Sequence, residues 1–298
     1  MTRRSTPAVL GTVLLLCCRP GLTVAQTQAR ESVDVSPEKP VVHPSAYTSD
    51  KTGTNPLNFQ RTFQLTNEYD AVTSNAEVNF TRFRYTEAFR PDFSLRLEVP
   101  LVYAHATIAG NSATGDDDGS GSTSPSDEID ASRFGLGDVV LKASYVPFAD
   151  HRRGILFAAE LAAPTASDDV LGTEKWVISP AVTYAIFLPK MMIFAPTYKH
   201  SLSFAGDGDR NDINKGTFDF YLVKKFDKGR QWINIDPTYL LDFENDQYSG
   251  GTLRVTYGRL LGKMSGAVIS GYVKPGVGVG SDRPNDWSAE VGVSLIGF

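Results

Sequence analysis

The stretch from Trp287 to Phe298 reads W-S-A-E-V-G-V-S-L-I-G-F, and it decides the fold. Apolar residues alternate here with small or polar ones, which is the period of a β-strand whose two faces differ. The stretch stops on an aromatic residue that no polar tail follows. This ending predicts that the C-terminus lies inside a β-sheet.

The N-terminal residues have the pattern of an export signal. Arg3 and Arg4 precede an apolar run from Ala8 to Cys18, and Thr23-Val-Ala25 offers small residues for cleavage. The run is shorter than the roughly 20 residues that a membrane-spanning helix needs. We therefore expect residues 1–25 to be a signal peptide that is removed on export. Both cysteines of the chain lie in this run, so the exported chain would have no disulfide, thiolate nucleophile or cysteine ligand.

Composition narrows the class of protein further. The net charge is −5 at pH 7, and an acidic chain lacks the basic surface that nucleic acid requires. After the leader, no apolar run approaches the roughly 18 residues of a candidate transmembrane helix. Aromatic residues make up 11% of the chain, as expected for strands and for the aromatic belts of membrane barrels. These features favour a protein that has no nucleic-acid partner and is built from strands.

Alternating segments fill the chain after an irregular start. Residues 26–56 show no period and contain several prolines, so we expect an irregular periplasmic lead-in. From residue 57 onward apolar residues recur at every second position, most regularly between Phe93 and Leu101. Each segment is long enough to cross a bilayer as a tilted strand, which takes about 9–11 residues. The expected strands are 57–70, 76–89, 92–108, 133–147, 154–164, 174–187, 191–204, 216–226, 231–243, 251–261, 264–274 and 286–298.

The connections between these segments alternate in length. Every second one is a short turn, such as Arg90-Pro91 or residues 261–263, and most of the others are long and acidic, such as residues 109–132 and 244–250. Short turns on one side and long loops on the other are typical of an outer-membrane barrel with both termini in the periplasm. The sequence thus predicts an all-β protein. It would be an antiparallel transmembrane β-barrel of about 12 strands over residues 57–298, in the outer membrane of a Gram-negative cell.

A resemblance to a known family rests on one part of the chain. The motif Phe134-Gly-Leu-Gly-Asp138 is followed by Leu161-Ala-Ala-Pro-Thr165, Leu171-Gly-Thr173, Trp176 and Pro180. In this order the residues resemble the outer-membrane family of MetA-pathway phenol-degradation proteins, which is grouped with porin-like transporters. The resemblance covers residues 133–187, and Ala166 stands where the family more often has Gly. It implies a β-barrel and the passage of small molecules, aromatic or apolar ones among them.

Charged residues within the strands alternate with apolar ones. An Arg or Lys side chain at the lipid midplane costs about 2–4 kcal/mol, so these charges must face the barrel interior. They could pair with one another and fill a closed structural or adhesion barrel, or they could form a polar channel wall that sets selectivity. The two interpretations are compatible, and the sequence leaves both open. The predicted pore-lining residues are Arg84, Arg96, Glu98, Lys142, Glu160, Lys199, Asp219, Asp236, Arg254 and Glu290.

An outer-membrane lipid-modifying enzyme is the alternative from another class. It would need a serine and a histidine on one face, whereas Ser201 and Ser203 lie at odd separations from His200. We therefore expect no catalytic residues. The acidic run from Asp207 to Asp212 lacks the Gly and the closing Glu of a calcium loop, so neither a metal nor a cofactor is expected.

These features predict a channel or facilitator for small molecules, without catalysis. Its partners would be outer-membrane lipid, a small-molecule solute and the barrel-assembly machinery, which would recognise the C-terminal Phe298. One detail of the last strand leaves two alternatives. Phe298 is out of phase with the apolar face that ends at Leu295, so either a bulge near Gly297 shifts it or this end is buried on both faces.

Overall fold

The computed structural model describes residues 50–109, 128–244 and 249–298. The predicted signal peptide, the lead-in up to residue 49 and the central part of the loop predicted at 109–132 lie outside the described residues and stay predictions. Residues 245–248 of another predicted loop also lie outside them. In the part of the chain that is described, no helix is long and apolar enough to cross a membrane.

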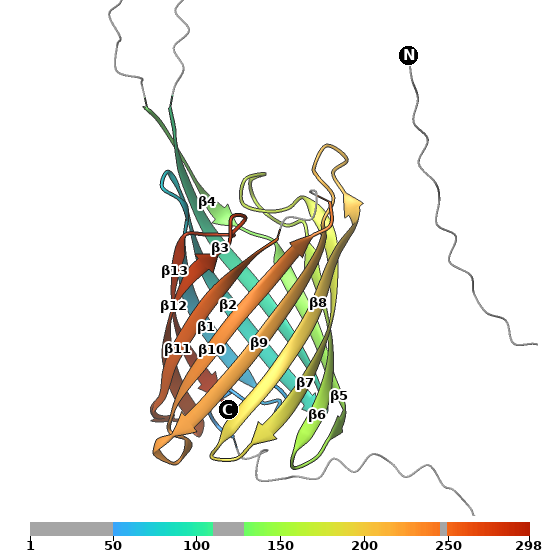
Figure 1. Ribbon diagram of the computed structural model, residues 1–298, viewed down its shortest axis with the longest axis vertical. Coiled ribbons are helices and arrows are strands. Elements are labelled where there is room, and N and C mark those ends of the chain that lie inside the picture. Colours follow the sequence, from blue (N-terminus) through green and yellow to red (C-terminus); the bar gives the residue numbers. More distant parts are fainter. Residues whose placement is uncertain (1–49, 110–127, 245–248) are drawn as a thin grey trace, which may run out of the picture. The chain divides into compact units, whose positions relative to one another are not determined.

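Thirteen strands form one closed antiparallel sheet (Figure 1). Strands that are consecutive in sequence pair with each other along most of the sheet, and the pairing of β13 with β1 closes it. Closure removes the free edges of the wall, as lipid requires, because no water there can satisfy open N–H and C=O groups. The strands are β1 (Thr62–Thr73), β2 (Ala76–Arg90), β3 (Phe93–Ala109), β4 (Glu128–Leu136), β5 (Val139–Ala149), β6 (Arg153–Ala163), β7 (Lys175–Leu188), β8 (Met192–Gly206), β9 (Asn214–Phe226), β10 (Gln231–Asp242), β11 (Ser249–Met264), β12 (Ala267–Val279) and β13 (Trp287–Ile296).

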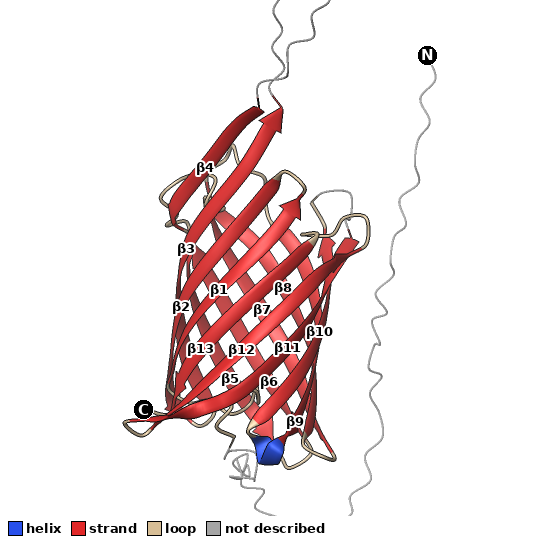
Figure 2. Cartoon of the chain, turned by 90° about the vertical axis from the view of Figure 1, so that its left-hand side faces the viewer, coloured by secondary structure: helices blue, strands red, loops and turns tan. Residues whose placement is uncertain are grey.

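The two ends of the barrel differ, as the connection lengths predict. One end has the tight turns, among them residues 150–152, residues 189–191 and the 3₁₀ turn η1 (Asp227–Gly229), and it is referred to below as the short-turn end. The opposite end, the loop end, has the longer connections. Figure 2 shows the strands tilted between these ends, with β3 and β4 extending beyond the rest of the wall at the loop end.

One predicted strand, 133–147, is two strands in the structure. Both β4 and β5 pair with β3, β5 along its first half and β4 along its second, so together they occupy one position in the wall. The wall therefore has the twelve positions that the sequence predicts. The break falls at Gly137, whose N–H donates to the Pro100 carbonyl at 2.9 Å. A Cβ at Gly137 would lie 2.8 Å from Val102, so only glycine allows this close approach.

Two further predicted boundaries are wrong. The first strand begins at Thr62 rather than at residue 57, because the residues before it leave the wall and enter the barrel. The turn expected at 261–263 lies at Ser265-Gly266, which both have positive φ angles, 49° and 90°. Such a pair forms a two-residue hairpin turn whose twist suits the flanking strands. Glycine and other small residues weaken the alternating pattern here, so the sequence places the turn a few residues before its true position.

The alternation in the sequence sorts the side chains onto two faces. Along β13, exposed residues such as Val291 and Val293 alternate with buried ones such as Ser288 and Glu290. Outward positions elsewhere carry large apolar side chains, for example Leu65 at 42% exposure. An apolar outer band around a polar interior is the arrangement of a barrel that spans lipid.

Gly297 explains the phase of the last strand. β13 ends at the buried Ile296, and Gly297 follows with a φ of 74°. Glycine adopts this conformation without steric cost, whereas other residues rarely do. Phe298 therefore leaves the alternation of the strand, and its half-exposed ring lies 6.0 Å from the Arg61 guanidinium. The pairing of β13 with β1 and with β12 contains no bulge, so the first alternative is wrong in form, and the phase changes at the positive φ of Gly297 after the strand has ended.

The motif that carries the family resemblance holds the loop between β6 and β7 against the break in the wall. The Asp138 carboxylate accepts the backbone N–H groups of Thr165 and Ala166, each at 3.2 Å, and that of Thr173 at 2.7 Å. Leu171 of this loop is buried and lies 3.1 Å from the place that a Cβ on Gly135 would occupy. The glycines and the aspartate of the motif thus serve the packing of a loop.

Replacing Asp138 with Ala is expected to free this loop in a barrel that still folds. A hydrogen bond to a charged group is worth about 1.5–3 kcal/mol, so opening of the loop should increase at least about tenfold. Chymotrypsin cleavage after Leu171, read by mass spectrometry, measures this opening. Asp209→Ala, at an exposed position of the loop between β8 and β9, is the control. Equal cleavage of the two variants would contradict the role assigned to Asp138.

Candidate functional site

The predicted pore-lining residues lie on the inner face of the wall. Arg84, for example, is partly buried between the exposed outward residues Phe83 and Tyr85. Eight of the ten belong to ion pairs that join inward side chains of different strands. Their role in selecting a solute stays a prediction, whereas their inward direction agrees with the argument from the cost of charge in lipid.

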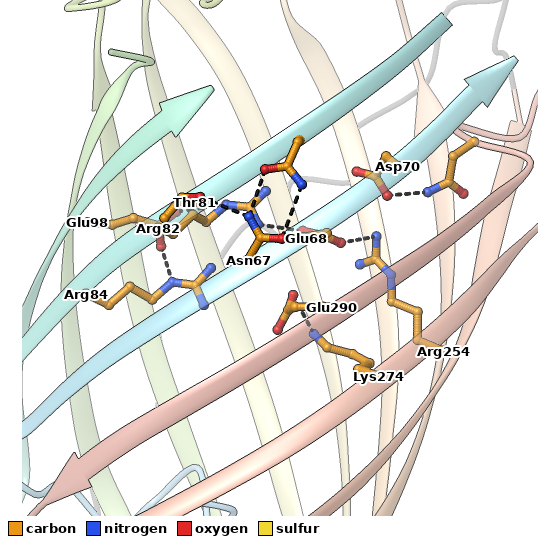
Figure 3. A network of polar contacts seen from close by, with 12 residues as sticks. Asn67, Glu68, Asp70, Thr81, Arg82, Arg84, Glu98, Arg254, Lys274 and Glu290 are labelled. Carbon is orange, nitrogen blue, oxygen red and sulfur yellow. Dashed lines mark hydrogen bonds and ion pairs between the residues drawn. The ribbon is translucent and has the colours of Figure 1, made fainter. Parts of the chain in front are cut away.

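A first network of ion pairs joins β1, β2, β3 and β11 (Figure 3). Glu68 accepts from Arg82 at 2.5 Å and lies 3.1 Å from the Arg254 guanidinium. Glu98 pairs with Arg84 at 2.5 Å and with Arg82 at 3.6 Å. Burying these charges is tolerable because each has an opposite charge within reach. The network therefore neutralises most of the charge on this side of the lumen.

Glu290 and Lys274 form a neighbouring pair on β13 and β12. Their charged atoms lie 3.1 Å apart, and the Tyr272 hydroxyl donates to the same Glu290 carboxylate. The register of the two strands places Lys274 directly opposite Glu290, which explains why they meet. The pair continues the first network around the wall.

A second network is centred on Glu160 of β6. Its carboxylate lies 2.8 Å from the Lys142 ammonium, 3.5 Å from that of Lys199 and 3.6 Å from the Arg96 guanidinium. One carboxylate thus pairs with three cations.

Asp219 and Asp236 are the two predicted residues that the structure does not bring into an ion pair among the described residues. They come from the neighbouring strands β9 and β10, and each has one buried carboxylate oxygen without a hydrogen-bond partner in the described part of the chain. A buried polar atom without a partner is costly. The lumen is therefore incompletely satisfied beside these two strands.

Three network members were missed by the sequence analysis, namely Glu68, Arg82 and Lys274. Arg82 lies two residues before Arg84 and so shares its face, which strand periodicity could have revealed. Glu68 and Lys274 lie in strands whose alternation is weak. Their roles depend on partners in other strands, and the sequence alone does not identify those partners.

Residues 50–60, referred to below as the inner segment, lie inside the short-turn end of the barrel. Asp50 pairs with Lys225 of β9 at 2.6 Å, and their side chains are only 7% and 9% exposed. The Tyr221 hydroxyl donates to the Thr54 carbonyl at 2.9 Å. Burial by itself would raise the pKa of the Asp50 carboxyl, but Lys225 and the hydrogen bonds from Thr52 hold that pKa below its ordinary value of 3.8. A charged pair thus anchors the inner segment.

An apolar cluster seals the inner segment to the wall. Leu57 belongs to a buried cluster with inward side chains that include Leu156, Phe187, Val223 and Trp232, each at most 8% exposed. Apolar inward residues were not expected, because the interior of a spanning barrel is generally polar. The sequence does hold a signal for them. In Leu156-Phe157 and in Trp232-Ile233 two consecutive residues are apolar, so both faces of the strand are apolar.

A cavity of about 440 Å³ lies in the lumen beside the inner segment. Asn55 and Gln60 of the inner segment contribute to its lining, as do the wall residues Arg84, Arg96 and Tyr272. The cavity is partly open, and the inner segment and the inner face of the wall supply its lining. It is the candidate functional site.

The structure does not bring a serine to His200. Its Nδ1 lies 2.8 Å from the Tyr198 hydroxyl and its Nε2 lies 3.0 Å from the Asn214 side-chain oxygen. Ser201 instead bonds to Ser179, with the two hydroxyl oxygens 2.8 Å apart. Among the described residues, no group of three or more His, Cys, Asp and Glu side chains is placed to hold a metal ion.

The model of the family described as "Putative MetA-pathway of phenol degradation" matches residues 49–249. The chain belongs to this family. No curated protein matches the sequence.

Two solved structures share the fold. The COG4313 outer membrane channel from Pseudomonas putida F1 is similar with a TM-score of 0.56 and 11% identity, over 82% of this chain and 98% of that one. The NanC porin is similar with a TM-score of 0.52 and 12% identity, over 79% of this chain and 99% of that one. At such identities the likeness concerns the fold alone, which is that of an outer-membrane-type β-barrel.

Asp50→Asn is expected to loosen the inner segment. The change leaves the Lys225 ammonium buried without its counter-charge, which costs about 3–5 kcal/mol. A spin label on Lys51→Cys, an exposed position, measures the mobility of the segment in a chain that starts at residue 26 and has no other cysteine. Asp150→Asn, in a turn at the same end, is the control. An unchanged spectrum in Asp50→Asn would mean that the ion pair does not hold the segment.

The same label measures the pH dependence of docking. Because the folded pKa of Asp50 lies below the ordinary value of 3.8, its charge stabilises the docked segment at every pH above that value. This stabilisation is lost as the pH falls through the lowered pKa. Label mobility in the parent chain should therefore stay constant from neutral pH to about 4 and increase only below it. Release near neutral pH would contradict this assignment.

Proposed function

We propose that this protein is an outer-membrane channel or facilitator for small molecules, without catalysis or cofactor. The observation that carries the proposal is a polar lumen with a cavity, closed at the short-turn end by the inner segment. A segment held by an ion pair, hydrogen bonds and an apolar cluster can be displaced, whereas the hydrogen-bonded wall cannot. The inward charges would then set which solutes pass.

Export and assembly belong to the same proposal. Residues 1–25 would direct the chain across the inner membrane, and the barrel-assembly machinery would bind the C-terminal end. The exposed ring of Phe298, just beyond β13, offers a contact for that machinery. Outer-membrane lipid would cover the outward apolar residues.

A closed structural or adhesion barrel is the competing function. In that case the ion pairs of Glu68 and Glu160 would only fill and stiffen the lumen. One observation favours passage instead. A tightly filled interior would leave no cavity of about 440 Å³.

The lipid-modifying enzyme has less support. Such chemistry needs a nucleophile within hydrogen-bond reach of its base. Both ring nitrogens of His200 lie beside other groups, from Tyr198 and Asn214. Ser201 belongs to a separate hydrogen bond with Ser179.

The proposal extends to small aromatic or apolar solutes. The description of the family refers to phenol degradation. In this chain Phe59, Tyr221, Trp232 and Tyr272 are among the residues that line the cavity, and aromatic side chains pack well against apolar rings. A small aromatic solute would therefore fit both the family and the lining.

Leu57→Ala is expected to increase conductance through reconstituted protein. Truncating a buried leucine costs about 2–5 kcal/mol, and here the loss falls on the seal between inner segment and wall. Single-channel recording in planar bilayers should show rare openings for the intact chain and more frequent ones for the variant. Leu65→Ala, which changes an outward leucine that is 42% exposed, is the matched control. Silence from all three, while each still migrates as a heat-modifiable barrel, would refute the channel.

A further inference from the structure

The chemistry of the cavity is specific in a way that the channel proposal does not require. Its volume of about 440 Å³ falls within the range of roughly 300–1,000 Å³ that is usual for small-molecule sites. The basic residues that line it are Arg84, Arg96, Lys142 and Lys274, from strands on one side of the barrel. No Asp or Glu of the described chain lines it.

The absence of acids from the lining follows from their order along the strands. On β3, Ser94 and Arg96 line the cavity, and Glu98, the next inward residue toward the loop end, does not. On β9, Tyr221 lines it and Asp219, again nearer the loop end, does not. Glu98 and Asp219 thus lie one inward step nearer the loop end than the lining residues of their strands, whereas Arg96 and Lys142 line the cavity itself. A site lined by one sign of charge attracts the opposite sign.

Arg96 has the most donors to offer. Its one ion pair, with Glu160, is loose at 3.6 Å, and its side chain makes no hydrogen bond within the described part of the chain. Guanidinium has five N–H donors in a fork that matches a carboxylate. Glu160 must also serve Lys142 and Lys199, so it cannot neutralise all three cations.

Apolar and hydroxyl groups complete the lining. Trp232 and Tyr272 present rings, and Ser94 and Ser144 present hydroxyls on the strands that carry Arg96 and Lys142. An inorganic anion would use the charges and leave the rings without contacts. A molecule that has a carboxylate and an aromatic body would use both.

We infer that the cavity is a binding site for a small organic anion, a carboxylate with an aromatic body, whose charge is held by Arg96 and Lys142. As a statement about the solute that passes, this rests on the proposed channel function. As a statement about binding, it stands on the lining alone.

Trp232 supplies the readout, because it lines the cavity and is only 5% exposed. The other tryptophans, Trp176 and Trp287, are exposed at 38% and 48%, and changing both to Phe leaves Trp232 as the single fluorophore. The full exported chain, folded in detergent, is titrated with para-nitrobenzoate and with para-nitrobenzamide. The two quenchers have nearly the same shape and differ in charge.

We expect saturable quenching by para-nitrobenzoate and affinity at least about tenfold lower for the amide, as loss of a charge-assisted hydrogen bond implies. Arg96→Gln and Lys142→Gln should each weaken binding of the benzoate about tenfold and leave the amide unchanged. Glu160→Gln should strengthen binding of the benzoate, because the three cations lose the acid that they share. Lys215→Gln, at an exposed position outside the lining, is the control and should have no effect.

Equal affinity for the two quenchers, or no saturable quenching, would overturn the inference. Glu160→Gln changes the affinity in the opposite direction from the cation variants, so a general loss of folding cannot imitate the expected set of results. Binding and conductance are separate measurements. A barrel that binds the benzoate and never conducts would refute the channel and retain the anion site. A barrel that conducts and does not distinguish the quenchers would retain the channel and refute the anion site.

Discussion

A charge on a strand of a closed sheet in lipid can face only the lumen, and the rest of this structure depends on that constraint. Because side chains alternate with period two, each Arg, Lys, Asp or Glu within the band is added to the same interior. The ion pairs around Glu68 and Glu160 are the consequence, since charges crowded into one space must compensate one another. The lipid surroundings alone are thus enough to explain why the interior is polar, whatever passes through it.

The charges inside the lumen are paired unevenly, and the uneven pairing determines which parts of the lumen can attract a charged solute. Glu160 serves three cations, whereas Asp219 and Asp236 have carboxylate oxygens without partners among the described residues. If the charges served only stability, the acids and bases would be expected to meet in equal numbers. Three cations that share one carboxylate leave part of their positive charge uncompensated, and charge in a narrow, poorly hydrated space acts strongly on a charged solute.

The sequence predicts the wall well, because strand periodicity is local. It predicts the twelve wall positions, all but one of the short turns and the inward direction of residues such as Arg84 and Glu98, all of which follow from neighbours within a few positions. It misses the break at Gly137, which depends on contact with Val102 of another strand. It also misses the inner segment, since the pairing of Asp50 with Lys225 joins residues far apart in the chain. Contacts of that kind leave no periodic trace.

The two ends of the lumen are controlled by different physical interactions. Toward the loop end the interior carries the ion pairs of Glu68 and Glu160, whereas at the short-turn end the single buried pair of Asp50 and Lys225 lies beside the apolar cluster around Leu57. Charge acts over distance and attracts a solute, whereas an apolar seal acts only by contact and excludes water. A purely polar solute would meet the apolar cluster that packs on Leu57, and a purely apolar one would have to pass the ion pairs first. A molecule with a charged group and a ring has an interaction to make at each stage, and the cavity lies where the two kinds of lining meet.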